Sequence, residues 1–133
     1  MLLDEVGDDD LGRLRSDCVT RLQDAVAGRR DALDGTVIQA IDAGALEELT
    51  IEDAAGVLAG EHGAPSADVI RAELLDRILI GMSTAVIDVD TLAREITLDR
   101  SAKELQQRIE GRAPMTLAEF VDIRHAIAAR SIE

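Results

Sequence analysis

Apolar residues recur along this chain at intervals of three and four, the spacing of one face of an α helix. In the first such segment Leu11, Leu14, Cys18 and Leu22 form a stripe that predicts an amphipathic helix over about 11–28. No long run of β-branched residues alternates with polar ones, so the pattern argues against a sheet.

The longest apolar segment covers about 66–84 and begins at Ser66, a good N-cap residue. It is apolar around much of its circumference, so we expect it to be the central and most buried helix of the fold. Its apolar residues are Ile70, Leu74, Leu75, Ile78, Leu79 and Met82.

Capping signals predict the shorter helices. A Ser or Thr followed three residues later by Glu, Asp or Gln can satisfy two backbone N–H groups that a helix start leaves unpaired. Glycines at 44 and 111 stand where a left-handed residue would end a helix. Asp90 is read as the N-cap of a helix over about 91–96, in preference to a strand over 86–90. The four start signals are Thr36 with Gln39, Thr50 with Asp53, Ser101 with Glu104, and Thr116 with Glu119, the last opening a helix to about residue 130.

The segment 60–65 holds two glycines and a proline and is the best linker in the chain. We therefore divide the chain into an N-terminal helical subdomain (1–60), a linker (61–65) and a C-terminal subdomain (66–133). With 133 residues in all, the chain suits one domain or two small subdomains that share a core. The predicted fold class is all-α, a compact bundle of about six to seven helices.

Charge is the strongest compositional signal. The chain carries 27 acidic and 14 basic residues, a net charge of −13, and Lys103 is its only lysine. Such acidity with almost no lysine is typical of proteins from salt-loving organisms, in which net charge keeps the surface hydrated at high ionic strength. An ordinary acidic bacterial protein is the alternative.

The chain start has neither the basic nor the apolar region of a signal peptide, and no apolar run reaches the length of a membrane span. Cys18 is the only cysteine, so it cannot form an intrachain disulfide, and its place on an apolar stripe predicts a core residue. These features predict a cytoplasmic protein that does not enter a membrane.

The two halves share a pattern of capped helix, terminating glycine, short loop and second capped helix. The series Thr36, Gln39, Ile41, Gly44, Thr50, Asp53, Val57 corresponds to Ser101, Glu104, Ile109, Gly111, Thr116, Glu119, Ile123. Such similarity suggests one helical unit used twice. The alternative is that any two short capped helices look alike.

The run from Thr91 to Ala128 resembles the lambda-repressor type of helix-turn-helix domain. The resemblance rests on Leu92-Ala93, on Ile109-Glu110-Gly111 and on Pro114-Met115-Thr116-Leu117, although the stretch from 96 to 109 is a few residues longer than in that family. It implies a helix-turn-helix unit in the C-terminal half, and if the repeat is a true duplication, the N-terminal half holds a degenerate copy. The whole chain also resembles an uncharacterised family of small haloarchaeal proteins, through the segments from Leu79 to Ala93 and from Ile109.

The first hypothesis is that the protein binds double-stranded DNA and regulates transcription. A recognition helix needs cationic and amide side chains on its outer face to hold phosphates and read base edges. The window 100–112 is the most basic in the chain. Its candidate DNA-binding residues are Arg100, Lys103, Gln106, Gln107, Arg108 and Arg112.

The net charge of −13 opposes that hypothesis, because a strongly acidic protein repels a polyanion except in high salt. The second hypothesis is a helical protein-interaction module, a helix-turn-helix unit that has lost its basic face. In that case the helix over 66–84 could form the seam of a homodimer or hold a protein partner.

We expect no enzymatic activity, no metal and no cofactor. The two histidines, His62 and His125, lie far apart in sequence and have no partner pattern. The acidic pairs and triplets lack the ligand spacing of a calcium loop.

Overall fold

The computed structural model describes residues 1–4, 6 and 10–131, and in that part of the chain the fold is all-α, as predicted. The described residues form seven α helices and two short 3-10 turns, η1 (Arg30–Ala32) and η2 (Leu46–Glu48). The helices are α1 (Leu11–Val26), α2 (Gly35–Ala43), α3 (Ile51–Ala59), α4 (Ala67–Ala85), α5 (Val89–Glu95), α6 (Ala102–Ile109) and α7 (Leu117–Ser131).

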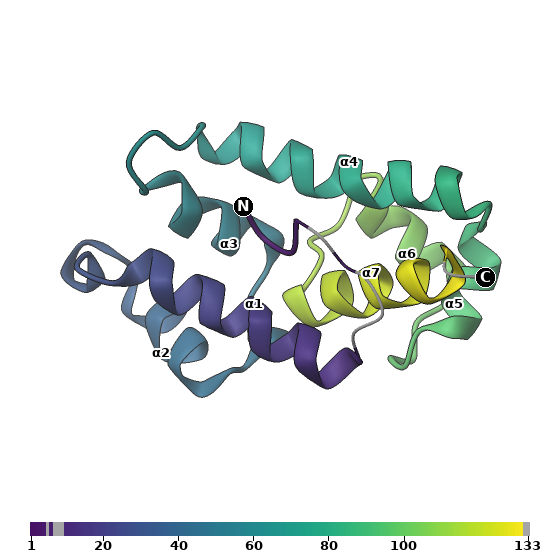
Figure 1. The fold of residues 1–133 in the computed structure, drawn as a ribbon, viewed down its shortest axis with the longest axis horizontal. Coiled ribbons are helices and arrows are strands. Elements are labelled where there is room, and N and C mark those ends of the chain that lie inside the picture. Colours follow the sequence, from purple (N-terminus) through teal and green to yellow (C-terminus); the bar gives the residue numbers. More distant parts are fainter. Residues whose placement is uncertain (5, 7–9, 132–133) are drawn as a thin grey trace.

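The centre of the molecule is α7, which lies between α1 and α4 and contacts α3, α5 and η2 as well (Figure 1). Its side chains are buried on nearly all sides from Leu117 to Ile123, including the acidic Glu119 and Asp122. The prediction that the helix over 66–84 would be the central one is therefore wrong. Helix α4 forms an outer edge and buries a single stripe, Ile70, Leu74, Leu75 and Ile78.

Two helix–loop–helix units, α2–α3 and α6–α7, meet through their loops. The Leu117 N–H donates to the Leu49 carbonyl at 2.8 Å, and the Ile51 N–H donates to the Met115 carbonyl at 3.0 Å. These bonds form an antiparallel bridge between Thr50 and Thr116. Both threonines were matched in the predicted repeat, so the equivalent loops lie side by side; duplication itself stays a prediction.

Three of the four predicted capping boxes form, at Thr50 with Asp53, Ser101 with Glu104, and Thr116 with Glu119. The glycines at positions 44 and 111 adopt the left-handed conformation predicted for a helix end, with φ of 66° and 78°.

Two start signals were assigned to the wrong residue. The N-cap of α2 is Asp34, whose carboxylate accepts from Thr36 N at 2.8 Å, so Thr36 and Gln39 form no box. The N-cap of α5 is Asp88 and not Asp90, since Asp88 accepts from Thr91 N at 2.8 Å. In both cases a carboxylate begins the helix at an earlier residue, where it also interacts well with the helix dipole.

One continuous buried cluster draws on both predicted subdomains. Helix α3 packs on α4 across the predicted linker, and α1 packs on α7. The subdomains thus share a core, while the boundary at 61–65 stays a prediction. Among the described residues, no helix is both long enough and apolar enough to cross a bilayer.

Candidate functional site

Helix α6, the predicted recognition helix, is amphipathic. Its apolar residues Leu105 and Ile109 are buried, and Lys103 and Gln106 on its other side are exposed. Gln107 is half-buried. The amide of Gln106 donates to Glu110 at 3.0 Å, so one candidate reading residue is engaged with an acidic neighbour.

Two of the candidate cations turn toward the core. Arg100 Nε donates to the fully buried Glu119 at 2.7 Å. Arg108 Nε lies 2.9 Å from the same oxygen, Glu119 Oε2, as an ion pair without a directed hydrogen bond. The other Glu119 oxygen accepts from Thr116 N at 2.8 Å as part of the α7 capping box. The carboxylate is thus compensated by two guanidinium groups, as a buried charge requires.

The connection from α5 to α6 is also fixed to α7. Asp122, which is buried, accepts hydrogen bonds from the backbone N–H groups of Thr97 and Leu98 and from the Thr97 hydroxyl, all within 3.1 Å. Sequence reasoning missed both Glu119 and Asp122 as partners of this region, because acidic residues on an amphipathic helix are usually solvated.

The candidate DNA-binding set therefore separates into two groups. Arg100 and Arg108 hold a buried carboxylate, and Arg112 is exposed but forms an ion pair with Glu110. Lys103 and Gln106 are exposed on α6, with Gln107 partly accessible beside them. The second group and Arg112 are thus the candidate residues whose side chains are accessible to solvent.

A second surface lies on α4, the helix at the edge. Four large apolar side chains are exposed among the described residues, and all of them belong to α4 or to its C-cap. They are Val69 (45%), Leu79 (48%), Ile80 (59%) and Val86 (84%). A concentration of exposed apolar side chains on one element is typical of an interaction surface.

The C-cap of α4 is strained. Val86 adopts φ 54° and ψ 53°, the left-handed conformation, which is unfavourable for a β-branched side chain. Because this valine is almost fully exposed, burial in the monomer does not explain why a valine stands where a glycine would fit. Strain of this kind clusters at functional surfaces.

Two open hollows lie one after the other along α4, and together we name them the α4 groove. The first lies between α4 and the end of α6, where Ile109 and Glu110 form its far wall. The second continues past the C-terminal end of α4 to Val86 and Asp88. Leu79 lines both hollows, so they are neighbours along the same helix.

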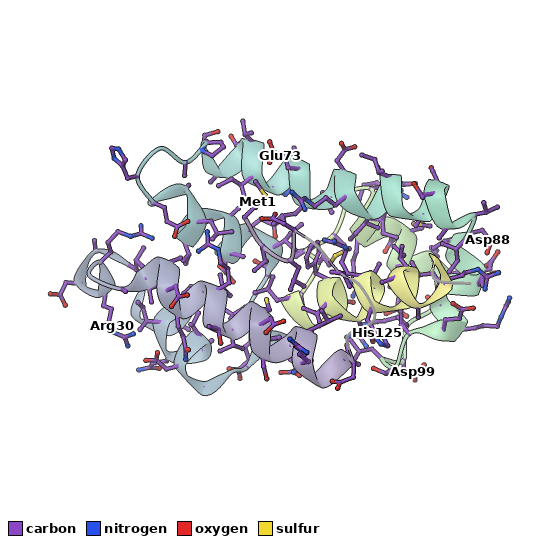
Figure 2. The ribbon with its side chains drawn as sticks, viewed as in Figure 1. Met1, Arg30, Glu73, Asp88, Asp99 and His125 are labelled. Carbon is purple, nitrogen blue, oxygen red and sulfur yellow. The ribbon has the colours of Figure 1, made fainter. Side chains whose placement is uncertain are left out.

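The groove has an acidic rim. Glu73 and Asp76 line the first hollow, and Asp88 lines the second. Figure 2 shows Glu73 on the outer edge of α4 and Asp88 just beyond its C-terminal end. The arginine at the groove, Arg71, is already engaged, since its Nε donates to Glu52 at 2.8 Å.

Reactive groups do not gather at either surface. Among the residues that the structure describes, no three His, Cys, Asp or Glu side chains are placed to hold a metal ion. Cys18 lies in the core, as predicted, and burial raises the pKa of its thiol to about 12. The expectations that the protein is no enzyme and needs no cofactor stay predictions.

Comparison with known proteins places the chain in a family. The model of a family described as a family of unknown function (DUF5791) matches residues 13–130. No curated protein and no solved structure matches the chain.

Proposed function

The chain belongs to this family of unknown function, because the family model matches it almost from end to end. From the geometry of α4 we propose that the protein is a helical protein-interaction module. Its binding surface is the α4 groove. The observation that carries the proposal is that three of the four large exposed apolar side chains of the described chain, Val69, Leu79 and Val86, line this groove.

The groove cannot be closed by rotating α4 inward. The inner face of α4 is already filled by buried side chains. The helix also packs closely on α7, since a Cβ added at Gly81 would lie 3.0 Å from Ile127 Cγ2. Leu79, which lines the groove close to that glycine, therefore stays exposed for as long as α4 and α7 are packed. The exposure of Leu79 is a fixed property of the fold, and a partner can bury this side chain.

The test places a photo-crosslinking residue at Ser83, which lines the groove, and in a second protein at Gln23, on the exposed side of α1. In extracts of the source organism, a defined partner should crosslink from position 83 and not from position 23. The purified partner should then bind Leu79→Gln at least about tenfold more weakly than wild type, as expected for loss of an apolar anchor. Equal crosslinking from both positions, or equal binding of the variant, would refute the proposal.

DNA binding in a regulatory role is the second candidate function. The accessible cation and amides of α6, at Lys103, Gln106 and Gln107, favour it, and Arg112 adds a charge beyond the helix. The net charge of −13 and the use of Arg100 and Arg108 at Glu119 oppose it. A salt-rich cytoplasm would screen the repulsion, and a cytoplasmic, halophilic setting is itself proposed from composition alone.

A salt titration of binding to fragmented genomic DNA tests this second candidate. Lys103→Ala with Arg112→Ala should abolish any binding and leave the unfolding transition in place, since neither side chain reaches the core. Changing Arg100 or Arg108 is a poor test, because it would leave Glu119 uncompensated. DNA binding that survives the double change would exclude Lys103 and Arg112 as the phosphate contacts.

A further inference from the structure

The α4 groove also indicates the chemistry of its partner, and this inference rests on the function proposed above. Residues that line the groove on α4 and at its C-cap include a series spaced alternately by three and four. The series consists of Val69, Ala72, Asp76, Leu79, Ser83 and Val86, and the other α4 residues that line the groove, Arg71, Glu73, Leu75 and Met82, flank it. A second helix packs against such a series through its own residues at i, i+3, i+4 and i+7.

The length of the series suits a helix. From Val69 to Val86 are 17 residue steps, which at about 1.5 Å per residue extend for roughly 25 Å, or nearly five helical turns. Both hollows are open along their length, and Leu79 lies at their junction. Two open hollows in a row along one helix fit a second helix lying along α4 and do not fit a small enclosed ligand.

Charge selects the kind of helix. Glu73 and Asp76 are exposed on the rim, and no hydrogen bond or ion pair joins either side chain to another described residue. The nearby arginines are occupied, Arg71 by Glu52 and Arg77 by Asp4. The groove therefore offers unpaired negative charge beside the apolar side chains of Val69, Leu79 and Val86.

We propose that the α4 groove binds a basic amphipathic helix of a partner protein, with apolar side chains over Leu79 and Val86 and with Lys or Arg facing Glu73 and Asp76. A second copy of this chain fits less well, because pairing α4 with α4 would bring two such rims, on molecules of net charge −13, into one seam.

The test uses a labelled synthetic peptide of about five helical turns, with leucines at intervals of three and four and with lysines and arginines elsewhere. Fluorescence anisotropy measures its affinity for the full chain. A scrambled peptide of identical composition has its leucines spread around the helix. We expect the amphipathic peptide to bind at least about tenfold more tightly than the scrambled one, and we expect Leu79→Gln to remove that advantage.

Matched variants separate the rim from the general acidity of the protein. Glu73→Gln with Asp76→Asn should weaken binding several-fold. Asp17→Asn on α1 with Glu48→Gln in η2 makes the same change of charge at exposed sites away from the groove, and it should change affinity less than twofold. Equal effects of the two pairs, or equal affinity for the scrambled peptide, would overturn the inference.

Sedimentation velocity distinguishes failure of this inference from failure of the proposed function. A dimer that Leu79→Gln disrupts would show that a second copy occupies the groove, which overturns the basic-helix partner and leaves the α4 groove as an interaction surface. If neither the peptide nor a second copy binds, and crosslinking from Ser83 finds no defined partner, both proposals fail.

Discussion

Replacing Glu119 by alanine removes the carboxylate that pairs with Arg108 of α6 and with Arg100 of the connection that precedes α6. Glu119 Oε2 faces Arg100 and Arg108, and Oε1 caps Thr116 N at the start of α7. The substitution therefore leaves two guanidinium groups without their counter-charge and one backbone N–H without its acceptor. It also leaves a small cavity in the centre of the fold.

The expected loss in the free energy of unfolding depends on how far the two arginine side chains are exposed. Removing one partner of a buried ion pair costs about 3–5 kcal/mol. The side chains of Arg100 and Arg108 are 27% and 22% exposed, so both can turn partly toward water, and about 2–3 kcal/mol is the better figure. Loss of the cap adds about 1 kcal/mol. The total of about 3–4 kcal/mol is a large share of the stability of a small domain.

Urea unfolding followed by far-UV circular dichroism, at about 0.1 M and about 2 M NaCl, measures this cost. Glu119→Gln keeps an oxygen for the cap and should recover about 1 kcal/mol. Arg30→Ala, which breaks the exposed pair of Arg30 with Asp42, is the control, and its smaller effect should vanish in high salt. A Glu119→Ala loss below about 1 kcal/mol, or one that high salt cancels, would refute the role given to this cluster.

Three further predictions concern single groups. Hydrogen bonds from Arg21 lower the pKa of the Glu61 carboxyl below its ordinary 4.5, so its contribution to stability is full above about pH 4.5 and is lost as the pH falls through the lower folded-state pKa. The Tm difference between wild type and Glu61→Gln should thus be constant near neutral pH and shrink toward zero in acid. A Tm difference that persists in strong acid would show that it does not come from the charged Glu61–Arg21 pair. Because burial raises the pKa of the Cys18 thiol to about 12, native protein should resist a disulfide-exchange reagent at about pH 8 and react once urea unfolds it; rapid labelling of the native protein would be inconsistent with the core position. Val86→Gly should raise stability by about 1 kcal/mol by relieving left-handed strain, whereas a destabilised variant in thermal melts would mean that the valine side chain packs within the monomer.

Local signals predicted much of this fold from sequence. Three capping boxes and two terminating glycines depend on residues within a few positions of one another, so they can be read directly. The position of α7 could not be predicted in the same way, because Glu119 and Asp122 give a buried helix the polar content of a surface helix. For α4 the error was the reverse: its apolar residues lie on both sides of the helix, so the sequence predicted a buried helix, but the outer apolar residues are exposed.

The candidate site shows the same limit. The basic residues in the window 100–112 predicted a DNA-recognition face, but Arg100 donates a hydrogen bond to the carboxylate of Glu119, nineteen residues later in the chain. The Thr116 capping box was recognised, and it places Glu119 at the start of α7. What the pattern did not show is that the second oxygen of that carboxylate remains available for cations from α6. Such a pairing depends on tertiary packing, which the periodicity of one helix does not encode.

The backbone bridge between Thr50 and Thr116 has a consequence for how the molecule comes apart. It joins segments 66 positions apart, one from each side of the exposed glycine-rich loop before α4. A protease that nicks this loop would leave two fragments still fastened by the bridge, by α1 against α7 and by α3 against α4. Such a nicked species should migrate as one particle under native conditions and separate only in denaturant, and the two pieces mixed together should reconstitute the native assembly.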